Sequence, residues 1–215
     1  VAPEPRVTAY TISLGSPAAM AEAAERAASR PLLKVKLGGP GTTDGERIAA
    51  VRRAAPNSEL IVDANEGWNE DNLARNLAAC ADCGVTLIEQ PLPEGRDAAL
   101  SRFKRPVPVC ADESVHDRAS LDLLAGKYDA VNIKLDKAGG LTEALALAAE
   151  AERRGLAIMA GCMVSTSLSM APAMLVAQRA RVVDLDGPLL LAKDRADGLR
   201  YEGSLVYPAD PALWG

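Results

Sequence analysis

The stretch Leu32-Leu33-Lys34-Val35-Lys36-Leu37-Gly38 has the composition of a short buried strand, yet it carries two lysines two residues apart. Side chains at positions i and i+2 of a strand point to the same face, so Lys34 and Lys36 converge on one region. A lysine that loses its water shell holds its proton less tightly and can then act as a base. Considered alone, the stretch favours an edge strand with both lysines in water, and the rest of the chain reverses that preference.

The overall composition is that of one ordinary globular domain or one large barrel. The chain has 215 residues, of which 48% are hydrophobic and 25% are charged. A net charge of -5 without basic clusters argues against a nucleic-acid partner. No apolar run approaches the roughly 18 to 20 residues that a membrane span needs, and the first residues lack the features of a secretory signal. We therefore expect a cytoplasmic protein with no membrane partner.

Four cysteines are present, and two of them form a C-x-x-C at Cys80 and Cys83. A single such pair, on a helix-like segment and with one histidine in the whole chain, is a weak signal for zinc or redox chemistry. We expect reduced thiols.

Short β-branched runs alternate with helical segments along the whole chain. The predicted strands cover residues 6–14, 32–37, 59–63, 86–89, 107–111, 130–135, 157–161 and 181–185. Helices are predicted at about 16–29, 43–54, 70–80, 97–102, 117–125, 141–154 and 167–178, with a glycine-rich loop at 38–41. Successive strand ends lie 22 to 27 residues apart, and this even period favours a closed TIM-like (β/α)8 or (β/α)7β barrel over an open sheet.

Acidic residues end three consecutive predicted strands, in the segments LIVDAN, LIEQP and VCADES. These residues are Asp63, Glu89 and Asp112. One acid at a strand end is often only a helix cap, but in a TIM barrel the C-terminal strand ends meet at one mouth. Three converging carboxylates repel one another unless a cation lies among them. Oxygen ligands alone indicate a hard ion, and Mg²⁺ fits best.

A further lysine, Lys134, ends the strand predicted at 130–135. In an eight-stranded ring that strand lies opposite the strand of Lys36, so the two lysines would face each other across the metal. Bases on both faces of one carbon suit removal of a proton from one side and its return from the other. The metal would stabilise the charge that develops on an adjacent carboxylate.

At these residues the chain resembles the enolase superfamily, in which a Lys or His base works with Mg²⁺. The K-x-K, D-A-N, I-E-Q-P, A-D-E-S and N-I-K-L-D-K-A-G-G segments are similar to the muconate-lactonizing subgroup. The D-L-D-G-P at 184–188 is similar to the dipeptide epimerases of the L-Ala-D/L-Glu type. The resemblance covers roughly residues 6 to 193 and rests on the whole set of segments.

The resemblance implies Mg²⁺-dependent epimerisation at the α-carbon of a dipeptide's C-terminal residue, by two-base 1,1-proton transfer through an enolate. It implies acid/base roles for Lys36 and Lys134. It also implies metal ligation by Asp63, Glu89 and Asp112, and substrate binding by Lys34, Asp184, Asp186, Cys162 and Met163. Among these, Lys34 would help to neutralise the substrate carboxylate, and the two aspartates would bind the substrate's amino terminus. Glu113 is a candidate for orienting a lysine by hydrogen bonding.

The family also has an N-terminal α+β capping domain, and we expect this chain to comprise the barrel without that domain. We therefore expect an enolase-type catalytic barrel at residues 1–193 and a C-terminal tail at 194–215 that packs against the barrel and that cap. The expected partners are a small-molecule dipeptide, the capping domain or remainder of the chain, and further copies in a homo-oligomer. Two alternatives stay open: an o-succinylbenzoate synthase or cycloisomerase of the same superfamily, which has no use for Asp184 and Asp186, and a non-catalytic barrel fragment.

Overall fold

The computed structural model describes residues 2–39 and 43–214, so the glycine-rich loop predicted at 38–41 lies partly outside the described residues. The strands are β1 (Arg6–Val7), β2 (Tyr10–Ile12), β3 (Leu32–Lys36), β4 (Glu59–Asp63), β5 (Val85–Glu89), β6 (Val109–Ala111), β7 (Ala130–Ile133), β8 (Ala157–Ala160), β9 (Val182–Val183), β10 (Tyr201–Glu202) and β11 (Leu205–Val206). The α-helices are α1 (Pro17–Arg26), α2 (Asp44–Ala54), α3 (Glu70–Asp82), α4 (Leu135–Ala138), α5 (Leu141–Arg153) and α6 (Ser167–Ala177). Short 3₁₀ helices are η1 (Ala98–Ser101), η2 (Ala119–Leu123) and η3 (Gly187–Leu190). This alternation of parallel strands and helices confirms the predicted α/β class.

The chain divides into two compact units. The first unit comprises residues 10–114 and 123–130. The second unit comprises the chain up to residue 9, residues 115–122, and the chain from residue 131 onward. Within the described ranges, none of the helices is long and apolar enough to cross a membrane.

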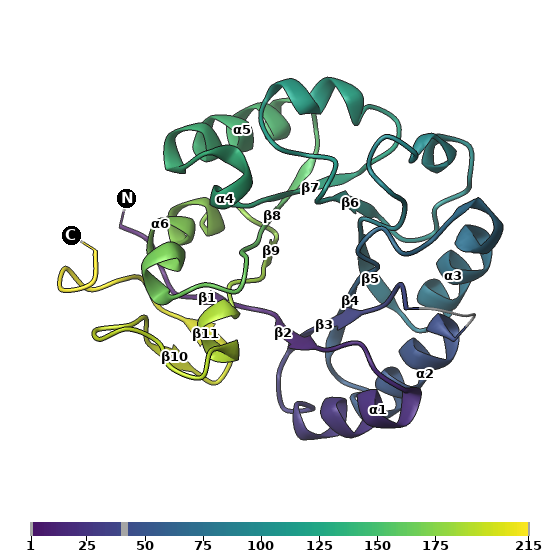
Figure 1. Ribbon diagram of the computed structural model, residues 1–215, viewed down its shortest axis with the longest axis horizontal. Coiled ribbons are helices and arrows are strands. Elements are labelled where there is room, and N and C mark those ends of the chain that lie inside the picture. Colours follow the sequence, from purple (N-terminus) through teal and green to yellow (C-terminus); the bar gives the residue numbers. More distant parts are fainter. Residues whose placement is uncertain (1, 40–42, 215) are drawn as a thin grey trace. The chain divides into compact units, whose positions relative to one another are not determined.

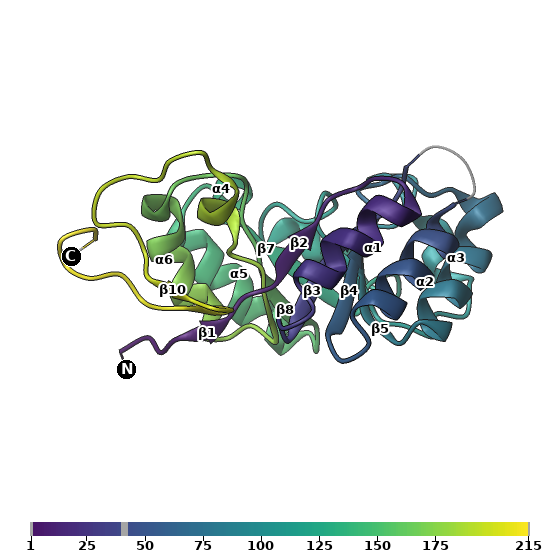
Figure 2. The same cartoon turned by 90° about the horizontal axis from the view of Figure 1, so that it is seen from below.

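In the first unit, strands β2 to β6 lie side by side in chain order and run parallel. Helices α1, α2 and α3 lie along the outer side of these strands, with α1 packed on α2 and α2 on α3 (Figures 1 and 2). Four of the five residues of β3, and four of the five of β4, are buried. Burial on both faces is typical of a parallel sheet, and it explains why these strands are nearly continuous apolar runs.

The register of these strands aligns the residues predicted at the strand ends. Lys36 is the partner of Asp63 between β3 and β4, and Asp63 is the partner of Glu89 between β4 and β5. Glu89 is in turn paired with Cys110 on β6, two residues before Asp112. Parallel strands share one C-terminal edge, so the register brings these side chains to that edge.

In the second unit, β8 and β9 are parallel neighbours, and helices α5 and α6 pack against each other and against β8 (Figure 1). A separate antiparallel sheet has the order β1, β11, β10. The tail from residue 194 contributes two of its three strands. The Tyr201 hydroxyl donates a hydrogen bond of 2.7 Å to the carbonyl of Leu185, just after β9.

The prediction of one continuous strand over residues 6–14 is wrong, because the chain changes its hydrogen-bond partner in the middle of that segment. β1 pairs with β11, and the Thr8 amide still donates to the carbonyl of Ser204 at 2.8 Å. The next amide, that of Ala9, donates to Val183 on β9 at 2.8 Å. Alternating apolar residues do not show which neighbour a strand will choose.

The helix predicted at 117–125 is also wrong, since only the 3₁₀ helix η2 forms there. The Asp117 carboxylate accepts hydrogen bonds from both the amide and the hydroxyl of Ser120, at 3.0 and 2.9 Å. Such local side-chain bonds compete with helical ones. The short helix α4, directly after Lys134, was not predicted.

Candidate active site

Three buried carboxylates lie together at the C-terminal ends of β4, β5 and β6. Oxygen atoms of Asp63, Glu89 and Asp112 all lie within 4.8 Å of one another. These residues are only 0%, 1% and 2% exposed. Buried carboxylates this close repel one another strongly, so the cluster requires positive charge nearby.

Two lysines of β3 supply positive charge in this structure. The Lys34 ammonium lies 2.7 Å from Glu89 Oε2 and 3.1 Å from Asp63 Oδ2. The Lys36 ammonium lies 2.7 Å from the same Asp63 oxygen. Burial by itself would raise the pKa of Asp63, but the two ammonium groups outweigh it and hold that pKa below its ordinary value. Asp63 is therefore ionised at neutral pH.

The two lysines differ in exposure. The Lys34 side chain is 4% exposed, whereas that of Lys36 is 31% exposed. Lys34 is enclosed among the carboxylates and is suited to balancing charge. Lys36 stands at the rim of the cluster, where a bound molecule can reach its amine.

An asparagine that was not predicted from the sequence connects this rim to Glu113. The Lys36 ammonium donates a 2.9 Å hydrogen bond to Asn65 Oδ1, and Asn65 Nδ2 donates to Glu113 Oε1 at 3.4 Å. Burial, followed by the charge of Asp112, raises the pKa of Glu113. Glu113 is thus connected to Lys36 through Asn65, and its predicted role in orienting a lysine stays a prediction. The only signal for Asn65 in the sequence was its position two residues after Asp63.

The loops after β3 and β4 pack backbone to backbone beside the cluster. Gly38 has a positive φ of 81°, and a Cβ atom added there would lie 2.0 Å from the carbonyl oxygen of Ala64. The buried carboxylate of Asp44 accepts hydrogen bonds of 2.8 Å from the Gly38 amide and from the Trp68 indole. The approach of the two loops thus depends on a residue without a side chain.

The remaining predicted residues belong to the second unit. Lys134 follows β7, occupies the N-cap position of α4 and is 8% exposed. Asp184 and Asp186 follow β9 and are 5% and 4% exposed. The two aspartates thus keep their predicted place at a strand end.

Cys162 and Met163 follow β8, and Met163 is 52% exposed. Their loop packs closely on Gly187, directly after Asp186. A Cβ atom at Gly187 would lie 2.8 Å from the Met163 carbonyl oxygen and 3.2 Å from Cys162 Sγ. The loops after β8 and β9 are therefore in contact.

The cluster of Asp63, Glu89 and Asp112 fits a hard divalent cation. It offers carboxylate oxygens only, its donors converge, and two of the three acids already bind an ammonium group. Mg²⁺ prefers such oxygen ligands. It usually keeps several bound waters, and substrate oxygens can take the place of some of them. Among the residues that the structure describes, this is the one group of three or more Asp, Glu, His or Cys side chains whose ligand atoms lie close enough together to hold a metal ion.

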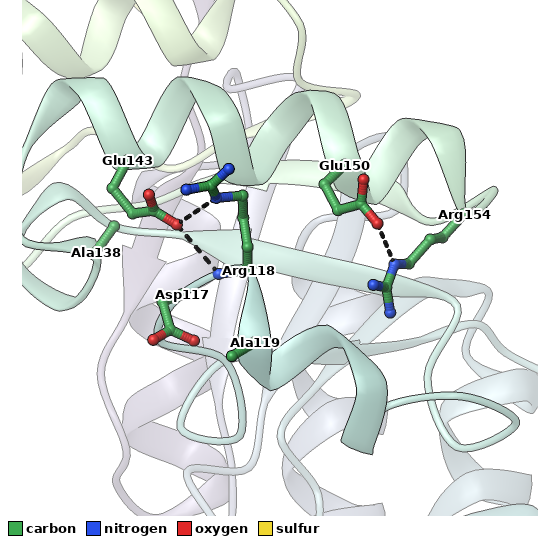
Figure 3. A pocket seen from close by; sticks show the side chains of 7 residues that line it. All are labelled: Asp117, Arg118, Ala119, Ala138, Glu143, Glu150 and Arg154. Atoms are coloured by element: carbon green, nitrogen blue, oxygen red, sulfur yellow. Dashed lines mark hydrogen bonds and ion pairs between the residues drawn. The ribbon is translucent and has the colours of Figure 1, made fainter.

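A cavity of about 670 Å³ in the second unit contains none of the predicted residues (Figure 3). Its lining consists of Asp117, Arg118, Ala119, Ala138, Glu143, Glu150 and Arg154. Arg118 lies 2.9 Å from Glu143, and Arg154 lies 2.6 Å from Glu150. The charges of these surface ion pairs balance one another, and we assign no function to this cavity.

The fold and the strand-end residues agree with a known family. Residues 19–208 match the sequence profile described as enolase C-terminal domain-like. The chain belongs to this family, and the resemblance drawn from the strand ends is confirmed.

Similar curated proteins are racemases and epimerases. The chain is 49% identical over 209 residues to an N-acetyl-D-glutamate racemase of a Pseudoalteromonas species, covering 97% of this chain and 66% of that protein. It is 48% identical over 201 residues to the L-Ala-D/L-Glu epimerase of Escherichia coli, covering 93% of this chain and 62% of that protein. The chain thus spans somewhat less than two thirds of the length of these relatives.

Similar solved structures point to the same group. An enolase family member from Agrobacterium tumefaciens, described as homologous to dipeptide epimerases and as holding sodium and L-Ala-L-Glu, is 59% identical with a TM-score of 0.97. That match covers 100% of this chain and 65% of the other. The substrate-liganded L-Ala-D/L-Glu epimerase of Bacillus subtilis is 33% identical with a TM-score of 0.90, covering 98% of this chain and 63% of the other.

Proposed function

We propose that the protein containing this chain is a Mg²⁺-dependent dipeptide epimerase, which inverts the α-carbon of the C-terminal residue of a dipeptide such as L-Ala-L-Glu. One observation carries the proposal. Lys36, Asp63 and Glu89 occupy one register row across three parallel strands, so an amine that a substrate can reach lies beside a converging set of carboxylates. The names of the similar proteins support the same reaction class.

Asp63, Glu89 and Asp112 would hold the Mg²⁺ ion. When bound, the ion would supply positive charge beside the carboxylate of the substrate residue that reacts. The buried ammonium of Lys34 would add to this charge, since it already pairs with two of the three acids.

Lys36 and Lys134 would exchange the α-proton. In its neutral form, Lys36 would accept the proton from one face of the α-carbon, so that the C–H bond breaks and an N–H bond forms. The electron pair moves into the carboxylate, giving an enolate. Protonated Lys134 would then give a proton to the opposite face, and in the reverse direction the two lysines exchange roles.

The second unit would hold the amino end of the dipeptide. Asp184 and Asp186 are separated by one residue and largely buried, so their carboxylates can bind an ammonium group. Cys162 and Met163, on the loop in contact with Gly187, would line this end of the pocket.

The direct test uses the protein expressed from its natural reading frame. With MgCl₂ and L-Ala-L-Glu in D₂O, NMR should show deuterium at the glutamate α-carbon together with formation of L-Ala-D-Glu, and no exchange at the alanine α-carbon. Addition of EDTA should stop both changes. Absence of deuterium at the glutamate α-carbon would refute the proposed reaction.

A second candidate is racemisation of an N-acylated amino acid, because a 49% identical relative is named as an N-acetyl-D-glutamate racemase. The same lysines and carboxylates would serve, but an N-acetyl group carries no ammonium for Asp184 and Asp186 to bind. The variant Asp186→Asn separates the two candidates. A dipeptide epimerase should lose most of its turnover of L-Ala-L-Glu, whereas an N-acetylglutamate racemase should be little affected.

A further inference from the structure

Gln90 joins the ends of two strands that carry metal-binding candidates. It directly follows Glu89, is fully buried, and adopts a positive φ of 33°. A positive φ is uncommon for a residue other than glycine, and it persists only where the surroundings enforce it. Here the Gln90 amide donates to the Cys110 carbonyl at 2.9 Å, and the Gln90 carbonyl accepts from the Glu66 amide at 2.8 Å.

The side chain of Gln90 reaches across to the residues after β6. Its Oε1 atom accepts hydrogen bonds from the backbone amides of Asp112, at 2.9 Å, and Ser114, at 3.1 Å. Its Nε2 atom lies within donating distance of the Leu92 carbonyl at 2.8 Å and the Ser114 hydroxyl at 2.9 Å. Backbone amides can only donate, so the amide oxygen must face Asp112, and the side chain has one orientation.

A buried polar network fixes the other end of this side chain. The Tyr128 hydroxyl lies 2.9 Å from Gln90 Nε2, as a third acceptor for its two N–H groups, and this hydroxyl donates to Asp97 Oδ2 at 2.8 Å. The Lys127 ammonium lies 2.6 Å from the second oxygen of Asp97. Burial raises the pKa of Tyr128 far above its ordinary value, so the hydroxyl keeps its proton.

We infer that Gln90 is a positioning residue that sets the spacing of Glu89 and Asp112 for a divalent cation before the cation binds. The inference rests on the metal site of the proposed function. Glu89 is the residue directly before Gln90, and the backbone amide of Asp112 donates a hydrogen bond to the Gln90 side-chain oxygen. Gln90 therefore connects two of the three carboxylate residues. Partners of this kind typically change metal affinity about 10- to 100-fold.

The test compares two variants that disturb the same network on different sides. Gln90→Met keeps the length of the side chain but leaves the Asp112 and Ser114 amides without their acceptor. Tyr128→Phe removes the hydroxyl but leaves the contact between Gln90 and Asp112 intact. Both should lower the melting temperature in EDTA, since both break buried hydrogen bonds.

Titration of the EDTA-treated proteins with MgCl₂ by calorimetry separates positioning from general stability. Gln90→Met should bind Mg²⁺ about 10- to 100-fold more weakly than the unmodified protein, whereas Tyr128→Phe should bind within about 2-fold of it. Equal Mg²⁺ affinities for Gln90→Met and the unmodified protein would overturn the positioning role of Gln90 and leave the metal site standing. If the unmodified protein itself bound no Mg²⁺, the metal site would be refuted as well.

A measurement without a variant keeps the inference testable if Gln90→Met does not fold. In the unmodified, metal-free protein, the Asp112 amide should exchange with D₂O at least about 100-fold more slowly than an unprotected amide, because Gln90 holds it before the metal arrives. Exchange at the unprotected rate would overturn the inference.

Discussion

Lys36 is held by two oxygen atoms of different character, the carboxylate of Asp63 at 2.7 Å and the amide of Asn65 at 2.9 Å. The carboxylate attracts the ammonium form of Lys36. The uncharged amide of Asn65 orients the Lys36 amine without adding a charge beside it. A base that transfers a proton must be aimed within a fraction of an ångström. Asn65 is therefore expected to act on the reaction through Lys36.

The variant Asn65→Ala tests this orientation. Removing the amide should slow α-proton exchange about 10- to 100-fold for the epimer whose proton faces Lys36, and much less for the other epimer. NMR in D₂O, started separately from L-Ala-L-Glu and L-Ala-D-Glu, measures the two rates. Asn57→Ala, at an exposed asparagine before β4, is the control, and equal slowing of both epimers by Asn65→Ala would contradict the assignment.

The residues predicted from sequence and those missed differ in one physical respect. Asp63 and Glu89 end apolar runs, and strand alternation fixes where their side chains point, so their place at one edge was predictable. Asn65 and Gln90 have φ values of 42° and 33°. Their side-chain directions depend on left-handed backbone turns that no pattern of side chains indicates.

At the scale of elements, the contact between the loops after β3 and β4 fixes Lys36 relative to Asp63. Gly38→Ala should destabilise the fold by about 3 kcal/mol or more, because the new Cβ atom meets a backbone oxygen and the residue keeps a left-handed conformation. Gly95→Ala is a matched control, since its φ is also positive, at 71°, and nothing lies within 4 Å of the position that a new Cβ atom would take. It should cost about 1 kcal/mol.

Urea unfolding measures both free energies. The Gly38 variant should also bind Mg²⁺ more weakly, whereas the Gly95 variant should not. Similar unfolding free energies for the two variants would contradict the close packing of the loops.

Helix α6 is capped by a residue from the C-terminal tail. Asp194 accepts hydrogen bonds from the amide of Ser167, at 3.0 Å, and from its hydroxyl. Burial acts to raise the pKa of Asp194, but these hydrogen bonds outweigh it and lower that pKa below its ordinary value. Asp194→Ala should therefore cost about 1 kcal/mol at neutral pH.

The pH dependence follows from the direction of this shift. A carboxyl group with a lowered pKa in the folded state stabilises the fold above its unfolded pKa of about 3.9, and it loses this effect as the pH falls through the folded pKa. The difference in unfolding free energy between Asp194→Ala and the unmodified protein should shrink as the pH falls below the unfolded pKa of about 3.9. Asp194→Asn, which can still accept a hydrogen bond but carries no charge, should lie between Asp194→Ala and the unmodified protein at neutral pH. A difference that does not change with pH would contradict a role for the ionised carboxylate.

Most elements were predictable because the parallel strands are short apolar runs, most of which end at a polar residue or a glycine. The wrong predictions of secondary structure arose where contacts between distant parts of the chain, or local side-chain hydrogen bonds, decide the conformation. The segment 6–14 splits because the Thr8 amide bonds to Ser204, in the turn before β11, and the Ala9 amide bonds to Val183 on β9. The 3₁₀ helix η2 stays short because Asp117 and Ser120 bond to each other.

At the scale of the whole molecule, Mg²⁺ binding should be coupled to folding. A ligand at about 100 times its dissociation constant raises the free energy of unfolding by about 2.7 kcal/mol. MgCl₂ should therefore raise the melting temperature of the protein, and EDTA should reverse the rise. Asp112→Asn should abolish the effect, whereas Asp82→Asn, the same change at an exposed residue of α3, should keep it. An undiminished rise in the Asp112 variant would remove that residue from the metal site.

The two-base assignment is the central claim, and it is tested most directly by the pair Lys36→Ala and Lys134→Ala in D₂O. Each variant should fail to interconvert L-Ala-L-Glu and L-Ala-D-Glu. Each should still exchange the α-proton of one epimer, and the epimer should be opposite in the two variants, because the remaining lysine serves only its own face. Full epimerisation by either variant, or exchange of the same epimer by both, would contradict the assignment of one lysine to each face.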